Sequence, residues 1–199
     1  MAIVRRQGTR IVDRSSGHAV SMAAAKRQLR IEPDDTDQDE YIEELCAAAH
    51  QFVESQLGFP IMRQTRRTDL SGFPSGAIWL GGGAALTVGA VKYIDAAGTQ
   101  QMLASSDYIV DAVSIPAALH PAPLKTWPSA QARPSAVQIE WTAGWANPAD
   151  VPADLIHAMK LLIGHWDQTR EAASLGTLSK EVEFAIAATL APYRIQFFG

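Results

Sequence analysis

Three alternating carboxylates, Asp35, Asp37 and Asp39, are the residues of this sequence that come nearest to a metal site. Side chains spaced in this way can converge on a hard cation such as Ca²⁺. A calcium loop also needs a turn-forming Gly at its sixth position and an acid at its twelfth, where this chain has Glu40 and Cys46. Acids at the start of a helix favour its dipole and explain the run better. We therefore expect neither a metal nor another cofactor.

Other residues that could support catalysis lack the spacing that catalysis needs. Gly81–Gly83 lacks the Gly-Lys-Ser/Thr ending of a phosphate-binding loop and favours a tight turn. His157 and His165 are farther apart than the single helical turn that usually separates two metal ligands on a helix. Cys46 lies in an apolar run without basic neighbours, which is typical of a buried, inert thiol. The sequence therefore predicts that the protein is not an enzyme.

Composition limits the partners that the protein can have. The chain has 199 residues, 17 Lys and Arg against 21 Asp and Glu, and a net charge of -4. Because an acidic protein repels free nucleic acid, any contact with DNA must be local. The tryptophans are dispersed and not interleaved with Lys and Arg, which favours core anchoring over base stacking. No apolar stretch approaches the roughly 18 residues of a membrane span, so we expect an intracellular protein that does not contact a membrane.

Charge is segregated in the first part of the chain. The first thirty positions are mainly basic and include Arg5, Arg6, Arg10, Arg14, Lys26, Arg27 and Arg30. The segment that follows is acidic and includes Asp34, Asp35, Asp37, Asp39, Glu43 and Glu44. Two solvated faces would explain this pattern. Opposite charges that pair between neighbouring subunits of a ring are a second explanation, and arginines that face a DNA channel are a third.

Apolar periodicity predicts helices on both sides of a central region. We expect helices over 22–30, 37–57, 152–171 and 180–190. Ser21 is placed to cap the first helix, and Asp34, Asp35 or Thr36 the second, which ends at Gly58. The second and third helices have matching apolar stripes, so they should pack together as the core.

The central region has the composition of a small antiparallel β assembly. Short runs rich in β-branched residues alternate with turn residues, and we expect strands over 65–70, 77–80, 86–94, 100–103, 108–113 and 136–141. The Pro-rich stretch 116–134 should be a loop, because Pro is excluded from central strands. Residues 1–20 favour an extended arm, and a short strand at Thr9–Val12 is compatible with their composition.

These elements predict an α+β fold, with a helical core from N- and C-terminal helices, an inserted small antiparallel β region and an extended C-terminal tail. The expected boundaries are 1–20 for the basic arm, 21–60 for the N-terminal helices, 61–146 for the β-rich insertion, 147–192 for the C-terminal helices and 193–199 for the tail. The tail contains Tyr193, Arg194, Ile195, Gln196, Phe197 and Phe198. It is more apolar than a solvated terminus, which favours docking on a partner. A tail that folds back on its own helices is the alternative.

The order of elements and several short sequence phrases resemble the head-tail connector proteins of tailed phages, the adaptors of the head-completion type, including those of gene transfer agents. The phrases are 24–31 with the acidic 34–40, 47–58, 91–98, 108–111, Trp127-Pro128, 143–145, 151–155, 170–171 and 190–194. They keep a common order over about residues 20–195. The basic arm and residues 174–180 lie outside the resemblance.

The resemblance implies a structural subunit and no catalysis. Subunits of this kind form a ring, usually a dodecamer, beneath the portal protein at the capsid vertex. The tail, a stopper or a tail-terminator protein assembles on that ring, and double-stranded DNA passes through it without sequence-specific contact. Such a protein would assemble in the host cytoplasm and end in the neck of the particle, with residues 193–198 docked on the portal.

Two other classes of function are compatible with the same elements. A small ligand-binding or enzymatic α+β domain could form a pocket within the Trp-containing β insertion. It would need convergent polar residues, which the sequence does not reveal. A free DNA-binding regulator is a weaker alternative, since the net charge is negative and no recognition-helix signature is present.

Overall fold

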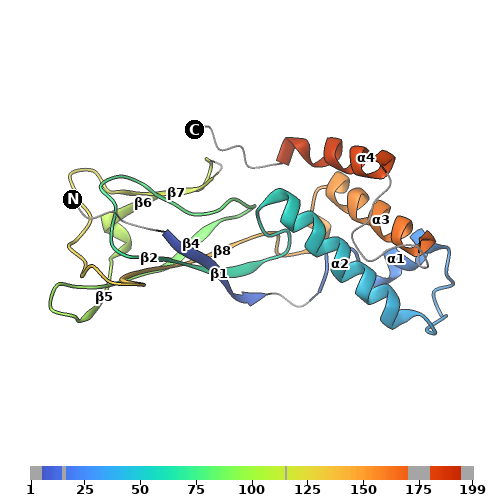
Figure 1. Cartoon of the computed structure of the whole chain (residues 1–199), viewed down its shortest axis with the longest axis horizontal. Coiled ribbons are helices and arrows are strands. Elements are labelled where there is room, and N and C mark those ends of the chain that lie inside the picture. Colours follow the sequence, from blue (N-terminus) through green and yellow to red (C-terminus); the bar gives the residue numbers. More distant parts are fainter. Residues whose placement is uncertain (1–5, 15–16, 115, 170–179, 194–199) are drawn as a thin grey trace. The chain divides into compact units, whose positions relative to one another are not determined.

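The computed structural model describes residues 6–14, 17–114, 116–169 and 180–193, and they form two compact units. A β unit contains residues 6–14 and 63–144, and a helical unit contains residues 17–62 and 145–193 (Figure 1). The architecture is mixed α+β with antiparallel sheets, as the sequence predicts. No helix in these described ranges is long and apolar enough to cross a membrane.

Four α-helices form the helical unit: α1 (Met22–Leu29), α2 (Asp39–Leu57), α3 (Ala153–Gln168) and α4 (Lys180–Leu190). Helix α3 packs against both α2 and α4 (Figure 1). The apolar stripes of α2 and α3 meet in one buried cluster that includes Leu45, Val53, Leu155 and Leu162. The predicted packing of these two helices is therefore confirmed, and its cause is burial of both stripes from water.

Local signals set most of the helix ends. Ser21 caps α1 as expected, because its hydroxyl accepts a hydrogen bond from the Ala24 N–H. Gly58 ends α2 in the left-handed conformation, at φ 77°, and donates its N–H to the Glu54 carbonyl. The predicted cap of α2 among Asp34, Asp35 or Thr36 is wrong. The helix begins at Asp39, because the Pro33 and Asp35 carbonyls accept hydrogen bonds from the Lys26 ammonium, which keeps this segment outside the helix.

The larger sheet of the β unit is antiparallel and has the order β1-β2-β8-β4-β5. Its strands are β1 (Arg6–Arg14), β2 (Gln64–Leu70), β8 (Val137–Ala143), β4 (Thr87–Ile94) and β5 (Gln100–Met102). Central strand β8 alternates fully, with Val137, Ile139, Trp141 and Ala143 buried. This period of two places one sheet face in the core and leaves the other partly exposed.

A smaller sheet has the order β3-β7-β6, with β3 at Ile78–Trp79, β7 at Ala118–Pro121 and β6 at Tyr108–Asp111. The expectation that 116–134 holds no central strand is therefore wrong, because β7 is central. Pro121 is tolerated because it ends the strand, beyond the two residues that pair with β3. The rest of the Pro-rich stretch is held by Trp127, which stacks on Phe73 at 5.3 Å and donates its Nε1–H to the Gly76 carbonyl.

The short strand expected at Thr9–Val12 is present in the N-terminal segment and is longer than expected. Residues 6–14 form a nine-residue strand that pairs along β2, from Arg6 opposite Leu70 to Arg14 opposite Gln64. Two register irregularities interrupt this pairing, between Arg6 and Gly8 and between Ile11 and Asp13. Such irregularities twist an edge strand and limit non-specific pairing.

Candidate assembly surfaces

Lys26, which the sequence places among residues for contact between subunits, is instead used inside the helical unit. Its side chain is 6% exposed, and its ammonium group lies 2.6 Å from Asp39 Oδ1. The same nitrogen donates to the carbonyl oxygens of Pro33, at 3.2 Å, and of Asp35, at 2.7 Å. Lys26 therefore holds the acidic segment before α2 against α1. The structure therefore corrects the hypothesis that Lys26 contacts a neighbouring subunit, because its ammonium group is buried and already paired within its own unit.

The other basic residues are divided between the two units. Arg10 and Arg14 are exposed on β1, and Arg10 Nε lies 3.8 Å from Asp69 Oδ2 on β2. Arg27 and Arg30 are exposed at the end of α1. Arg6 belongs to β1, and Arg5 lies outside the described residues. The basic segment is thus divided between the two units, because its first half belongs to a strand of the β unit and its second half to a helix of the helical unit.

The acidic residues remain together in the helical unit. Asp34, Asp35 and Asp37 are exposed in the loop before α2, and Glu43 and Glu44 are exposed on that helix. The described part of the helical unit has fourteen Asp and Glu against five Lys and Arg. The described part of the β unit has six Asp and Glu against nine Lys and Arg. The two units therefore have opposite net charge, a property of the fold that the linear sequence does not reveal.

Two histidines connect α2 to the segment before α1. His18 Nε2 lies 3.2 Å from Glu43 Oε1, and His50 Nε2 lies 3.2 Å from Glu54 Oε1. The His50 Nδ1 accepts the Ala19 N–H, so the His50 side chain bonds through both ring nitrogens. These contacts fix the chain before α1. No group of three or more potential metal-ligating side chains forms within the described ranges.

The predicted docking tail begins with a residue that belongs to the helical unit. Tyr193 packs against the helical core, and its hydroxyl donates to the Asp154 carboxylate at 2.8 and 2.9 Å. This hydrogen bond is the largest cause of a raised pKa of Tyr193. Desolvation and the negative charge of Asp154 are smaller causes in the same direction. Arg194, Ile195, Gln196, Phe197 and Phe198 lie outside the described residues. Tyr193 is therefore part of the helical unit, and the rest of the predicted docking segment falls outside the described residues.

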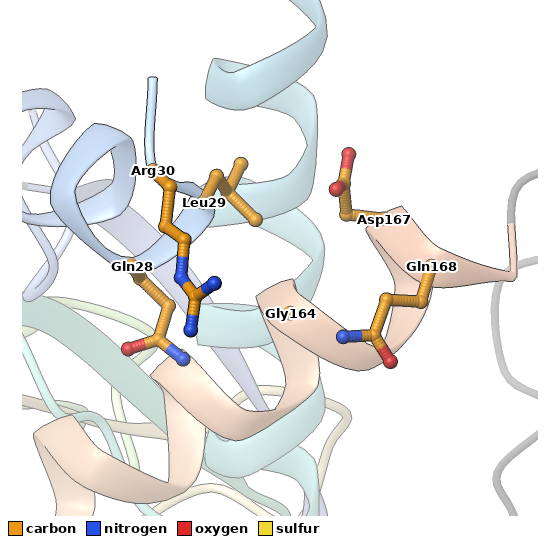
Figure 2. A pocket seen from close by; sticks show the side chains of 6 residues that line it. All are labelled: Gln28, Leu29, Arg30, Gly164, Asp167 and Gln168. Atoms are coloured by element: carbon orange, nitrogen blue, oxygen red, sulfur yellow. The ribbon is translucent and has the colours of Figure 1, made fainter. Parts of the chain in front are cut away.

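A cavity of about 340 Å³ lies in the helical unit between the end of α1 and α3 (Figure 2). Its lining consists of Gln28, Leu29, Arg30, Gly164, Asp167 and Gln168. Arg30 and Asp167 carry opposite charges, but Figure 2 shows the Asp167 carboxylate pointing away from the Arg30 guanidinium. The lining contains no nucleophile beside a general base. The cavity is also outside the β unit, where the ligand-binding alternative places its pocket.

The single cysteine has the environment that the sequence predicts. Cys46 is 2% exposed in the α2 face that packs into the core. Burial, assisted by the nearby Glu43 charge, raises the pKa of its thiol to about 11. A thiol with that pKa carries almost no thiolate near neutral pH, so it cannot act as a nucleophile there.

Several exposed apolar side chains were not identified from the sequence. The largest within the described ranges are Ile11, Val12, Trp79, Met102, Ile109, Val113, Leu124 and Phe184. Ile11 and Val12 lie on β1, and Met102 lies on β5, which are the two outer strands of the larger sheet. Exposed apolar residues on sheet edges are a signal of strand-to-strand association. Only the pairing of the strands identifies these residues as edge positions.

Comparison with known proteins gives matches among solved structures only. No protein-family model and no curated protein sequence matches the chain. A chain from the neck of an empty gene transfer agent particle, computed with six-fold symmetry, superposes with a TM-score of 0.76 and 20% identity. The match covers 97% of this chain and 98% of the other.

Two further structures give the same result. A chain from the virion of a native gene transfer agent particle has a TM-score of 0.76, 21% identity and coverage of 96% and 97%. A chain from the neck of the native particle, computed with twelve-fold symmetry, has a TM-score of 0.69, 20% identity and coverage of 97% and 98%. The chain therefore shares, over nearly its whole length, the fold of chains from gene transfer agent particles.

Proposed function

We propose that the protein is a head-tail connector, an adaptor subunit that forms a ring beneath the portal of a tailed phage or gene transfer agent. In this role it joins the capsid vertex to the tail and lines the passage for DNA. The observation that carries the proposal is the match to neck chains along nearly the full length of both partners. A match of this coverage must include both the helical unit and the β unit. A single supersecondary motif shared by many unrelated proteins would not give it.

The cyclic symmetry of the similar neck structures supports a ring of this chain. A ring needs subunits that present two different, complementary surfaces, because each copy contacts one neighbour on each side. The opposite net charges of the two units also fit a protein that contacts different partners at different places. Direct contact with passing DNA would fall to the β unit, because that unit has the excess of basic residues.

The C-terminal segment is proposed to dock on the portal. Helix α4 ends at Leu190, and the short turn Ala191–Tyr193 is tied to α3 through the bond from Tyr193 to Asp154. The six residues that follow include Ile195, Phe197 and Phe198. A short apolar segment anchored at its base can add a strand to an exposed sheet edge or fill a groove on a partner.

Native mass spectrometry and electron microscopy of the full chain, alone and mixed with the portal protein from the same genome, test the function. We expect cyclic oligomers, formed by the chain alone or only on the portal. A compact monomer or dimer that forms no ring and does not bind the portal would reject the connector function.

Deletion of residues 194–199 tests the docking segment separately. The deletion keeps Tyr193, so the melting temperature should change little while portal binding is lost. A truncated chain that unfolds, or one that binds the portal normally, would reject a docking role for the segment.

A further inference from the structure

The larger sheet of the β unit ends in two strands that have a described neighbour on one side only. Strand β1 pairs with β2, and strand β5 pairs with β4, at opposite ends of the five-stranded order. Each outer strand presents backbone N–H and C=O groups that a further strand can pair with. Within the part of the chain that the structure describes, the sheet is open and has two different edges.

The two edges differ in charge. Strands β1 and β2, with the residue before β2, contain six arginines against Asp13 and Asp69. Between Lys92 and Lys125 the chain has three aspartates and no Lys or Arg. Two of these aspartates flank β5, Asp95 before it and Asp107 after it. Asp107 forms an ion pair with Lys125 at 3.4 Å, and Lys92 of β4 lies opposite Met102, so the acidic charge next to β5 comes from Asp95. One end of the sheet is therefore strongly basic and the other carries the Asp95 carboxylate beside its outer strand, which is complementary charge at two edges of the same molecule.

Asp95 is held where it can act on the β5 edge. Its carboxylate accepts the N–H groups of Ala97 and Thr99, and its second oxygen accepts the Gln101 side chain from β5 itself. These bonds, led by the one from Gln101, lower the pKa of Asp95, so its carboxylate is ionised at neutral pH. The Asp95 carboxylate beside β5 is thus both charged and fixed in position by hydrogen bonds.

Both edges also expose apolar side chains. On β1, Ile11 is 40% exposed and Val12 is 53% exposed, and on β5 Met102 is 68% exposed. An exposed apolar edge strand is a risk for aggregation unless it is irregular, charged or covered. Strand β1 is both irregular and charged, which selects against random strands and favours a partner of matching charge and shape.

We propose that the β1 edge of one copy pairs with the β5 edge of the next copy, so that the sheet continues from subunit to subunit. This inference rests on the proposed function and adds the interface by which the ring closes. A contact between two different edges is head-to-tail, and such a contact generates a ring when the rotation between neighbouring copies closes. Pairing of two β1 edges would place Arg10 and Arg14 of one copy beside the same residues of another, and this like-charge contact is unfavourable. In this arrangement the basic strand β1 pairs with β5 of a neighbouring copy, and not with the acidic segment before and within α2.

Cysteine pairs across the proposed contact test it directly. Full-length variants would combine Arg10→Cys or Val12→Cys on β1 with Gln100→Cys or Met102→Cys on β5, all at exposed positions. The native Cys46 can remain, because it is buried. Mild oxidation should give a ladder of covalent oligomers from at least one double variant. The matched control, Val12→Cys with Ser129→Cys, places the second thiol on an exposed loop position of the same unit and should give none.

The outcomes separate this interface from the proposed function. Rings that form without a ladder from any of the four pairs would overturn the edge contact and leave the connector function standing. A covalent dimer from Val12→Cys alone would show pairing of two β1 edges and would also overturn it. Neither rings nor a ladder, with the portal protein present or absent, would overturn both proposals.

Charge exchange gives an independent readout. The double variant Arg10→Glu/Arg14→Glu should weaken association about tenfold at low salt, because two basic side chains of β1 become acidic while the β5 edge keeps the Asp95 carboxylate. Adding Gln100→Lys at the exposed β5 edge should restore much of the loss. The control Arg133→Glu changes net charge on the exposed Pro-rich loop and should have little effect. Equal weakening by the control, or no rescue, would refute a specific charge contact.

Discussion

Replacement of Lys26 by Met distinguishes a structural ion pair from a surface charge. The change keeps most of the buried apolar stem and removes the ammonium that binds Asp39 and the carbonyls of Pro33 and Asp35. A hydrogen bond to a charged group contributes about 1.5–3 kcal/mol, and loss of one partner of a buried pair costs about 3–5 kcal/mol. The Asp39 side chain is 37% exposed, so water replaces part of the loss. We therefore expect the helical unit to lose about 3 kcal/mol of stability.

Urea unfolding followed by far-ultraviolet circular dichroism measures this loss. The expected result is a lower midpoint with an unchanged slope, since the folded unit buries the same surface. Arg27→Met is the matched control, because Arg27 is the next residue of α1 and is exposed. Its change should stay within about 0.5 kcal/mol. If the two variants unfold at the same urea concentration, Lys26 does not hold the loop before α2. If Lys26→Met folds with unchanged stability but no longer assembles, the result would support the original hypothesis that Lys26 contacts a neighbouring subunit.

Three further predictions concern the two cores. Gly81→Ala should destabilise the β unit by about 1–3 kcal/mol, because a Cβ would lie 2.7 Å from Cη2 of the buried Trp141 ring. Gly76→Ala, where a Cβ meets no atom within 4 Å, should leave the melting temperature unchanged, and equal melting of the two variants would contradict the packing. Cys46 should resist a thiol reagent at pH 7 until denaturant unfolds the chain, and rapid labelling of the native protein would show that α2 is not packed as described. Trp166→Ala should cost about 3–5 kcal/mol through the cavity it leaves beside Phe52, and unaltered calorimetric melting would exclude Trp166 from the core.

Local features of the sequence were sufficient for most of the elements. The spacing of apolar residues identified the helices at 39–57 and 153–168, and Ser21 and Gly58 marked the start of α1 and the end of α2. Alternation and turn residues located strands such as 64–70 and 137–143. These signals succeed because propensity, capping and periodicity act between residues only a few positions apart. The confirmed fold class follows from the same signals, since helical and alternating runs occupy separate parts of the chain.

The assembly surfaces could be predicted only in part. The sequence identified which residues are charged and that an apolar segment follows residue 193. It could not show that Tyr193 belongs to the helical unit, because its partner Asp154 lies 39 positions away. The exposed apolar residues of β1 and β5 were missed for the same reason. An edge strand is defined by the strand it lacks, and that depends on the pairing of the whole sheet.

The sequence by itself determined most of the elements, the absence of any recognised catalytic motif and the separation of charge along the chain. The tertiary structure decided which of those charges face solvent. Lys26 and Arg27 are consecutive basic residues on α1, yet one is buried against Asp39 and the other is exposed. Likewise, residues 6–14 are a strand only because residues 64–70 pair with them. In both cases the deciding partner comes from a distant or differently structured segment, and short-range propensity has no access to such contacts.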